Sequence, residues 1–445
     1  MAKVNRIHNH TDSSDMRLKD SNLFLKDLLD YSHEKGIDMV AITEHECLCD
    51  HVKAMRMREQ YPDMKIALGN EIYLLDREEH DKLKEAKEKI KYYHFILLAK
   101  NKAGHECLRR LSSEAWEGMY FYRMMERVPT FKDRLEYYLS LPEYKGTIIG
   151  STACLGGELS TLIIEGKDYK PFIDWCIKLF GEDFYLEMQP SHSEEQKVVN
   201  KKILEISEEY GIPYTISTDS HYKNLDSQKE HWNFLQSQEG DREVEDFYAY
   251  TYIMGDNELL EFFPKEQIDK ANEYGEELYN KIEEYDLFHS PILPPVFIPE
   301  NFDKDWVSMF AGRFDLPYTQ KYLSSPYIED RYYLYLIEQG YKVRGGKYDK
   351  EKEFERINVE LEQCWELSKN LGQHISKYHL AIQQILEIIW EISLIGPARG
   401  SASCFYLNYL IDLVQVNPLD YDLPYWRYME KDKVELSDKY VVRVA

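Results

Sequence analysis

Short apolar segments alternate with amphipathic segments through the first half of the chain. The apolar segments predict seven strands, at residues 4–7, 38–43, 66–73, 94–99, 147–151, 184–188 and 212–217. Between them, apolar residues recur at helical spacing, for example in residues 23–31, 78–91 and 194–210. Strands that alternate with helices predict a parallel sheet. Because metal-binding residue types lie mostly at the strand ends, we expect an α/β barrel with a polar rim at one mouth.

The first predicted strand ends in two histidines, His8 and His10, separated by one residue. Side chains alternate between the two faces of a strand, so residues two apart point the same way. Both imidazoles should therefore converge on one point, as a site for zinc or another transition metal requires. Taken alone, such a pair is more often a surface feature or chance than a metal site.

Further residues of metal-binding type follow the other strands or begin them. Each has a simpler explanation: Asp20 could cap the next helix, Cys154 could be a small core residue, His94 a core histidine and Glu71 a surface carboxylate. Together they are too many for chance, and such mixed donors hold more than one zinc, manganese or iron ion, an arrangement that suits phosphoester hydrolysis. The candidates are His8, His10, His45, Glu71, His94, Cys154, Asp219 and His221, with Asp20 or Asp15 from the first loop.

Composition narrows the classes of function. The chain has 445 residues, and 55 lysines and arginines against 80 aspartates and glutamates give a net charge of −25. This charge argues against a broad duplex-binding face, although a local basic groove stays compatible with it. The first residues lack an apolar signal core, and the longest apolar stretch, residues 385–395, is short and interrupted by glutamates. Seven irregularly spaced cysteines indicate reduced thiols, so we expect a cytoplasmic protein without a membrane segment.

Beyond His221 the hydrophobic pattern becomes helical. A proline-rich stretch at 288–296 predicts an interdomain linker, and helices are expected at 351–371 and 379–393. The turn that follows, at 395–403, contains Arg399, Gly400 and Ser401. A guanidinium, bare backbone N–H groups and a hydroxyl before a helix are suited to bind a phosphate. On composition alone, an ordinary helix-start turn is the favoured explanation.

The strand-end motifs of the first half resemble the PHP (polymerase and histidinol phosphatase) domain found at the amino terminus of bacterial C-family replicative polymerases, the DNA polymerase III alpha subunits. The resemblance implies that the nine ligands are His8, His10, Asp20, His45, Glu71, His94, Cys154, Asp219 and His221. Spacing to His45 favours Asp20 over Asp15. Glu44 stands where the family usually has aspartate, next to a ligand. The matching segments are His8-Asn9-His10, Asp20, Thr43-Glu44-His45, Gly69-Asn70-Glu71, residues 94–101, 151–156 and Asp219-Ser220-His221.

The turn at 395–403 is similar to the Gly-Pro-Gly-Arg-Gly-Ser motif that opens the polymerase palm and helps to hold the triphosphate of the incoming nucleotide. The match continues through 409–410, 417–423 and Arg427. Two details differ, since Ala398 replaces a glycine and Cys404-Phe405 replaces a second Gly-Ser pair. The family's next segment, Pro-Asp-x-Asp, supplies two magnesium-binding carboxylates, and it does not occur in the sequence, where residues 430–438 follow instead.

The resemblance implies an overall organisation. We expect a distorted (β/α)7 PHP barrel at residues 1–288, a linker at 289–296 and a mainly helical, amino-terminal part of a C-family palm at 297–445. The barrel would bind two or three divalent ions (zinc, manganese or iron) and act as a 3′-to-5′ exonuclease or phosphoesterase. Arg399, Gly400 and Ser401 would bind nucleotide.

Polymerisation would need magnesium and a second chain that carries the missing aspartates, as in a split polymerase, for which a phage source is plausible; a truncated gene is the alternative. The expected partners are the 3′ end of a DNA primer, this carboxy-terminal polymerase half and other replisome proteins. Two other hypotheses stay open. One is a non-catalytic assembly subunit whose metals only stabilise the fold. The other is a stand-alone phosphatase of the histidinol phosphatase type, against which the palm-like half argues.

Overall fold

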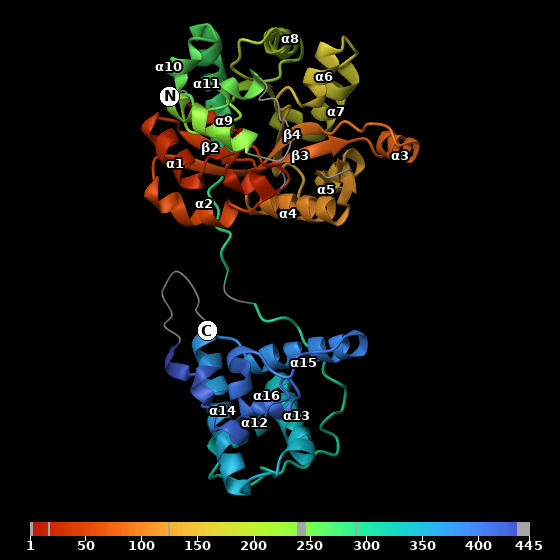
Figure 1. The fold of residues 1–445 in the computed structure, drawn as a ribbon, viewed down its shortest axis with the longest axis vertical. Helices are drawn as coiled ribbons and strands as arrows, with labels where there is room; N and C mark the ends of the chain where they lie inside the picture. The colour runs from red at the N-terminus through yellow and green to blue at the C-terminus, as the bar shows by residue number, and fades with distance from the viewer. Residues whose placement is uncertain (1–2, 17, 123–124, 238–245, 290–291, 434–445) are drawn as a thin grey trace. The chain divides into compact units, whose positions relative to one another are not determined.

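The computed structural model describes the chain except residues 1–2, 17, 123–124, 238–245, 290–291 and 434–445. It divides into two compact units, Met1–Leu287 and Phe288–Ala445 (Figure 1). Each unit has its own buried apolar cluster, as expected for parts that fold around separate cores.

The first unit is built on one curved sheet whose ends meet. Its strands pair in the order β1-β2-β3-β4-β8-β9-β10. A parallel bridge between Asn9 and Ser220 joins the chain after the first strand to the chain after the last, and the His10 amide donates to the Ser220 carbonyl at 2.9 Å. The sheet is therefore a nearly closed seven-stranded barrel, which confirms the predicted fold class. The strands are β1 Asn5–Arg6, β2 Met39–Ile42, β3 Lys65–Leu75, β4 Tyr93–Ala99, β8 Ile148–Ser151, β9 Phe184–Met188 and β10 Tyr214–Ile216.

The prediction of a parallel sheet is wrong for one strand. β4 runs antiparallel to both β3 and β8, whereas the other pairs along the barrel are parallel. β3 is long and overruns the barrel, and helix α3 (Arg77–Ala86) follows it directly, so the chain returns along β3 instead of crossing to the other end. α3 is also shorter than predicted, because Lys87 adopts a left-handed conformation with φ of 56° and ends the helix.

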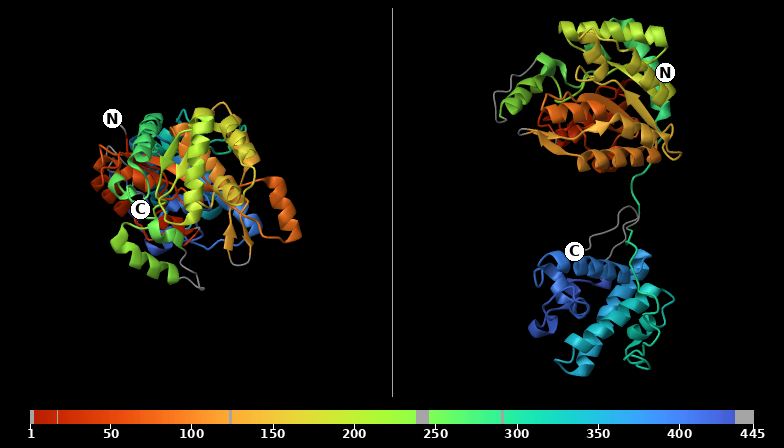
Figure 2. Two further views of the ribbon diagram at one scale, coloured as in Figure 1. Left: turned by 90° about the horizontal axis from the view of Figure 1, so that it is seen from above. Right: turned by 90° about the vertical axis from the view of Figure 1, so that its right-hand side faces the viewer.

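Alternate residues of the strands enter two different cores. Phe95 and Leu97 of β4 belong to a large cluster that also contains helix residues, so they face outward, toward the helices that surround the sheet (Figure 2). Ile96 and Leu98 belong to a smaller cluster made mainly of strand residues, which fills the barrel. The helices of this unit are α1 Leu25–Glu34, α2 His51–Met57, α3, α4 Lys102–Glu117, α5 Lys132–Ser140, α6 Glu158–Ile164, α7 Lys170–Phe180, α8 Glu194–Tyr210, α9 Gln228–Gln236, α10 Asp256–Leu259 and α11 Lys265–Lys281.

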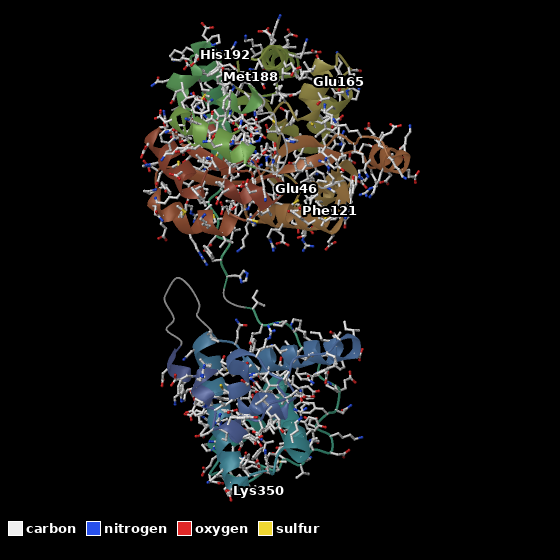
Figure 3. The ribbon with its side chains drawn as sticks, in the orientation of Figure 1. Glu46, Phe121, Glu165, Met188, His192 and Lys350 are labelled. Carbon is white, nitrogen blue, oxygen red and sulfur yellow. The ribbon has the colours of Figure 1, made fainter. Side chains whose placement is uncertain are left out.

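Short strands outside the barrel were not predicted. β5 (Tyr120–Tyr122) and β6 (Met125–Arg127) form an antiparallel pair, and Phe121 on β5 is exposed (Figure 3). β7 (Thr130–Phe131) adds to the protruding end of β3.

The second unit is helical, as predicted for this half. Its apolar cluster joins α12 (Pro317–Leu323), α13 (Ile328–Arg344), α14 (Lys350–Leu371), α15 (Ile375–Ile392) and α16 (Tyr406–Leu410). A 3-10 helix at Gly400–Cys404 precedes α16. In the part of the chain that the structure describes, no helix is long and apolar enough to cross a membrane.

Candidate metal centre

The barrel gathers the predicted ligands at one mouth. His8 and His10 follow β1, His45 follows β2, and Asp219 and His221 follow β10. The reversed direction of β4 explains why His94 lies there too: a strand that runs the opposite way presents its beginning where its neighbours present their ends. Three non-glycine residues at or beside these ligands adopt a left-handed backbone conformation, which is common at functional sites: Glu46, Ala153 and Asp219.

Glu71 faces histidines from three strands. Its Oε1 lies 3.1 Å from His8 Nε2 and 2.9 Å from His94 Nδ1. Its Oε2 lies 2.5 Å from His45 Nδ1 and 3.8 Å from His10 Nε2. Glu71 alternates with the outward-facing Ile72 along β3, so its carboxylate points into the barrel mouth.

Asp219 is the second carboxylate that connects several histidines. Its Oδ1 lies 3.1 Å from His8 Nε2 and 3.0 Å from His10 Nε2. Nε2 of His8 and Nε2 of His10 are themselves 3.0 Å apart, as expected for two imidazoles aimed at one point.

The remaining candidates, Asp20, His221 and Cys154, also lie against these histidines. Asp20 Oδ2 lies 3.2 Å from His45 Nε2 and 3.6 Å from His221 Nε2. On the other side of the cluster, Cys154 Sγ lies 3.5 Å from His94 Nδ1. The structure thus brings all nine predicted side chains into one continuous cluster, although they are spread from residue 8 to residue 221.

The cluster has the donor geometry of a site with several cations. Three groups, of which the first two share His10, each place their ligand atoms within 4.8 Å of one another: His10, His45 and His221; His8, His10 and Asp219; Glu71, His94 and Cys154. Among the described residues, Glu71 Oε2 and Asp219 Oδ1 accept no well-angled hydrogen bond, despite nearby imidazole nitrogens. Because these buried atoms converge on shared space rather than on one another, the residues fit divalent ions with mixed nitrogen, oxygen and sulfur ligands.

Burial and neighbouring charge set the protonation of the cluster. Burial by itself would lower the pKa of His45, but the Asp20 and Glu71 carboxylates raise it to about 10. Burial, followed by the charges of Asp219 and Glu71, raises the pKa of the Cys154 thiol well above its usual value. Cation binding would therefore release protons from these groups, and metal affinity should fall in acid.

Each half of the chain matches a known protein family. Residues 6–191 match the family described as PHP domain, and residues 331–440 match the bacterial DNA polymerase III alpha NTPase domain. The chain combines a PHP domain with a DNA polymerase III alpha-type domain.

Relatives align with nearly the whole chain. It is 38% identical to "Probable DNA polymerase YorL" of Bacillus subtilis (strain 168) and to "DNA-directed DNA polymerase" of Bacillus phage SPbeta, over 97% of this chain and 36% of each relative. It is 26% identical to the DNA polymerase III subunit alpha of Borreliella burgdorferi, over 97% of this chain and 34% of that protein. The chain thus spans about a third of the length of these relatives, and the predicted resemblance is confirmed. The PHP match together with the cluster indicates binding of divalent metal ions.

Glu187 of the PHP domain is a contributor that the sequence analysis missed. Its Oε1 lies 2.7 Å from His8 Nδ1, and the Gln189 amide donates to the same oxygen at 2.8 Å. This carboxylate fixes the orientation of the His8 ring, so that Nε2 faces the cluster. The sequence signal that could have identified Glu187 is a single carboxylate within an otherwise apolar strand. The structure shows every residue of this strand, β9, to be buried.

The first loop of the PHP domain separates the two aspartate candidates. Asp20 enters the cluster, and the Tyr248 hydroxyl donates to its Oδ2 at 3.1 Å. Asp15 instead accepts the backbone N–H of Asp20 at 3.2 Å, so it shapes the loop. Glu44 is buried beside the cluster and accepts hydrogen bonds from the Thr11 amide and hydroxyl, at 2.9 and 2.7 Å to its two oxygens.

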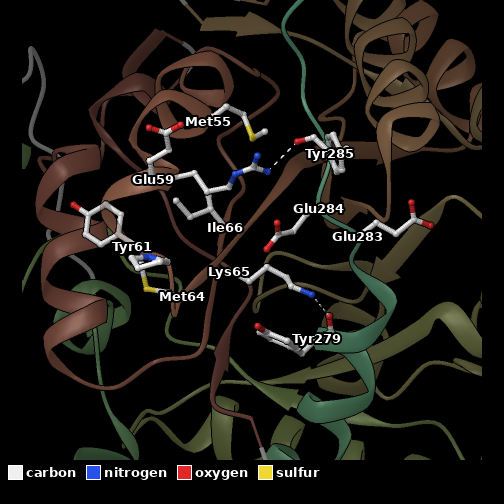
Figure 4. A pocket seen from close by; sticks show the side chains of 12 residues that line it. Met55, Glu59, Tyr61, Met64, Lys65, Ile66, Tyr279, Glu283, Glu284 and Tyr285 are labelled. Carbon is white, nitrogen blue, oxygen red and sulfur yellow. Dashed lines mark hydrogen bonds between the residues drawn. The ribbon is translucent and has the colours of Figure 1, made fainter. Parts of the chain in front are cut away.

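A cavity lies at the opposite end of the PHP barrel from the ligand cluster, where β3 begins. It measures about 240 Å³ and is lined by residues that include Lys65, Tyr279 and Tyr285 (Figure 4). Lys65 Nζ donates to the carbonyls of Tyr279 and Ile282 at 2.7 Å, and Arg58 donates to the Tyr285 carbonyl at 3.0 Å. These bonds attach the last segment of the unit to the barrel, and the cavity does not adjoin the ligand cluster.

The predicted phosphate-binding residues lie in the polymerase-type domain. Arg399 precedes the 3-10 helix Gly400–Cys404 and its side chain is exposed. Gly400 has a φ of 59°, a conformation that favours glycine. The Asn408 amide donates to the Ala402 carbonyl at 3.0 Å and fixes the turn against α16.

Proposed function

We propose that this chain is part of a DNA polymerase III alpha-like replicative polymerase, in which the PHP domain is a metal-dependent phosphoesterase that acts as a 3′-to-5′ exonuclease. The observation that carries the proposal is the presence of three ligand groups at one barrel mouth, where Glu71 and Asp219 each lie close to His8. In this proposal residues 1–288 form the PHP domain, 289–296 the linker and 297–445 the palm-type part.

Two or three ions of zinc, manganese or iron would be held by the nine candidate ligands. Bound ions of this kind supply a hydroxide nucleophile at neutral pH and neutralise phosphate charge. The protein's own contribution is to orient the ligands through Glu187 and Tyr248 and to bury them away from competing water. Imidazole, carboxylate and thiolate together favour these softer ions over magnesium.

The direct test measures bound metal and release of nucleotides from the 3′ end of single-stranded DNA. Asp219→Ala should lose both, because it removes a carboxylate that faces three histidines. Asp226→Ala, an exposed aspartate a few residues along the chain, is the matched control and should retain both. A protein that binds metal but releases no nucleotide would favour the alternative of a structural, non-catalytic metal site.

For the second unit, we propose that Arg399, Gly400 and Ser401 bind the phosphates of an incoming nucleotide. Magnesium-dependent polymerisation would require carboxylates from outside these 445 residues, on a second polypeptide that corresponds to the remainder of the relatives. The last turns of α15 and the segment just after it support such a partner, since Ile388 and Ile392 on the helix and Leu394 beyond it are largely exposed. DNA with a primer 3′ end and other replisome proteins are the further proposed partners.

This part of the proposal is tested with nucleotide binding to the chain and to Arg399→Ala. Because Arg399 is exposed, its removal should weaken triphosphate binding without lowering the thermal stability of the unit. Unchanged affinity in Arg399→Ala would place the nucleotide elsewhere.

A further inference from the structure

One side of α14 contacts the backbone next to the proposed phosphate-binding turn. Arg356 and Glu360 are four residues apart on this helix, so their side chains leave it on the same side. Glu360 is completely buried. A buried charge costs free energy unless partners satisfy it, so the partners of Glu360 indicate what this side of the helix does.

Glu360 holds the start of α16. Its Oε1 accepts the backbone N–H of Tyr406 at 2.9 Å, and its Oε2 accepts the backbone N–H of Leu407 at 2.8 Å. The first N–H groups of a helix have no partner within the helix, so a carboxylate that accepts two of them fixes where the helix begins. Because α16 begins just after the 3-10 helix Gly400–Cys404, Glu360 also fixes the end of the turn.

Arg356 holds the same turn at a second point. Its Nε donates to Glu360 Oε1 at 2.5 Å. Its Nη2 donates to the carbonyl of Cys404 at 2.8 Å and to the carbonyl of Leu423, in the segment after α16, at 2.9 Å. Since Nε and Nη2 are separate donor atoms in one rigid plane, a lysine with its single nitrogen cannot replace both.

The turn has exposed residues that packing does not fix. Gly400 adopts a φ of 59°, and glycine loses more conformational freedom on ordering than any other residue. Arg399 and Gly400 are both exposed. A nucleotide that had to order the turn as it bound would lose affinity by the cost of that ordering. Contacts from a buried helix can remove this cost in advance.

Resting on the proposed nucleotide binding of the second unit, we propose that Arg356 and Glu360 are positioning residues for the triphosphate. Through the backbone of residues 404–407 they hold the preceding turn in the conformation that receives it. Neither side chain would contact the nucleotide, because Glu360 is buried and the Arg356 donors are directed at Glu360 and at backbone carbonyls. Desolvation offsets much of the attraction within a buried ion pair, so the effect of this pair is on the geometry of the turn.

The test measures the affinity of the full chain for dTTP by isothermal titration calorimetry. Arg356→Lys keeps a positive charge beside Glu360 but has one donor nitrogen in place of two. Affinity should fall about tenfold if the turn then adopts the binding conformation about a tenth of the time. Arg331→Lys is the matched control, because Arg331 also donates to a backbone carbonyl, that of Ser325 at 2.7 Å, and it should keep wild-type affinity.

A double-mutant cycle with Arg399→Ala separates positioning from a general loss of structure. If Arg356 acts through the turn, Arg356→Lys should reduce dTTP affinity much less once the Arg399 side chain has been removed. An equal loss in the presence and absence of Arg399 overturns the proposal, and so does wild-type affinity in Arg356→Lys alone.

Hydrogen–deuterium exchange of the nucleotide-free chain separates this proposal from the proposed function. Glu360→Gln leaves one acceptor oxygen for two N–H groups, so peptides that contain Tyr406 and Leu407 should exchange faster than in the wild type. Arg356→Lys should have the same effect to a smaller degree, so the comparison remains if Glu360→Gln does not fold. If the wild type binds no dTTP, the nucleotide-binding function fails, while the exchange rates still decide the positioning role. Wild-type exchange in both variants overturns that role.

Discussion

Glu187 Oε1 lies 2.7 Å from Nδ1 of His8, with both side chains buried. His8 presents its other nitrogen to Glu71 and Asp219, at 3.1 Å in each case. A carboxylate behind a ligating imidazole fixes the tautomer, holds the ring in place and increases its basicity. The relationship joins the interior of β9 to the mouth of the barrel, and it gives Glu187 a role without direct contact to a substrate.

Glu187→Gln should therefore weaken metal binding by about 10–100-fold, as is typical for loss of such a partner. The measurement is a titration of the apo chain with zinc or manganese in competition with a chromophoric chelator. Glu182→Gln, an exposed change just before β9, should retain wild-type affinity. Wild-type affinity in Glu187→Gln would show that His8 needs no such support.

Removal of metal should lower the stability of the first unit alone, because the ligand cluster lies entirely within it. An ion present at 100 times its dissociation constant stabilises a site by about 2.7 kcal/mol. For a unit of this size that corresponds to a rise in melting temperature of about 4–5 °C. Differential scanning calorimetry before and after dialysis against EDTA should show one transition that moves and one that does not. Two transitions that both stay fixed would argue against a bound metal.

The sequence located the strand ends because a buried strand and the polar residue after it are local features. Asp219, for example, comes just after the strand predicted at 212–217 and stands two residues before His221. The direction of β4 was not predictable in this way, since a strand has the same alternating pattern whether it runs up or down. His94 was nevertheless placed correctly at a strand start, which only the reversed direction reconciles with a single mouth.

Glu187 was missed for a different physical reason. A carboxylate inside a strand faces either solvent or a partner, and only the three-dimensional structure shows that this one faces His8. Such a contact depends on how distant segments meet, which residue spacing does not encode.

A buried histidine pair should make the first unit sensitive to acid. His51 Nδ1 lies 3.0 Å from His105 Nε2, and His51 Nε2 lies 2.9 Å from the Gly69 carbonyl oxygen. Burial, followed by the charge of His105, lowers the pKa of His51 to about 3, and burial lowers that of His105 to about 4. Both rings are therefore neutral when folded, whereas the unfolded chain binds protons below about pH 6.5.

The stability contributed by this pair should be complete above about pH 6.5 and should fall as the pH drops toward 4, by about 1.4 kcal/mol per pH unit for each proton that only the unfolded chain binds. His51→Gln should make this decline shallower, and the exposed His33→Gln should not. Urea unfolding of metal-free protein at pH 7.5, 6.5 and 5.5 measures the slopes, and comparison with the wild type cancels the contribution of the ligand cluster. Identical slopes for wild type and His51→Gln would contradict the neutral pair.

In the second unit, α13 and α16 approach each other closely at Gly340. A Cβ on Gly340 would lie 1.9 Å from the Leu410 carbonyl oxygen, so the helices meet where only glycine fits. Alanine usually stabilises an exposed helix interior by about 1 kcal/mol relative to glycine. At Gly340 it should instead force the helices apart and destabilise the unit by about 1–3 kcal/mol, as overpacking does.

Because α16 follows the turn that carries Gly400 and Ser401, Gly340→Ala should also weaken nucleotide binding there, although residue 340 belongs to a different helix. Urea unfolding measures the stability, and triphosphate titration measures the turn. Gln339→Ala, the neighbouring change on α13, should leave both unchanged. If Gly340→Ala loses stability but keeps full affinity, the turn does not depend on the position of α16. If Gly340→Ala loses neither stability nor affinity, the prediction that a Cβ at residue 340 has no room beside the Leu410 carbonyl is wrong.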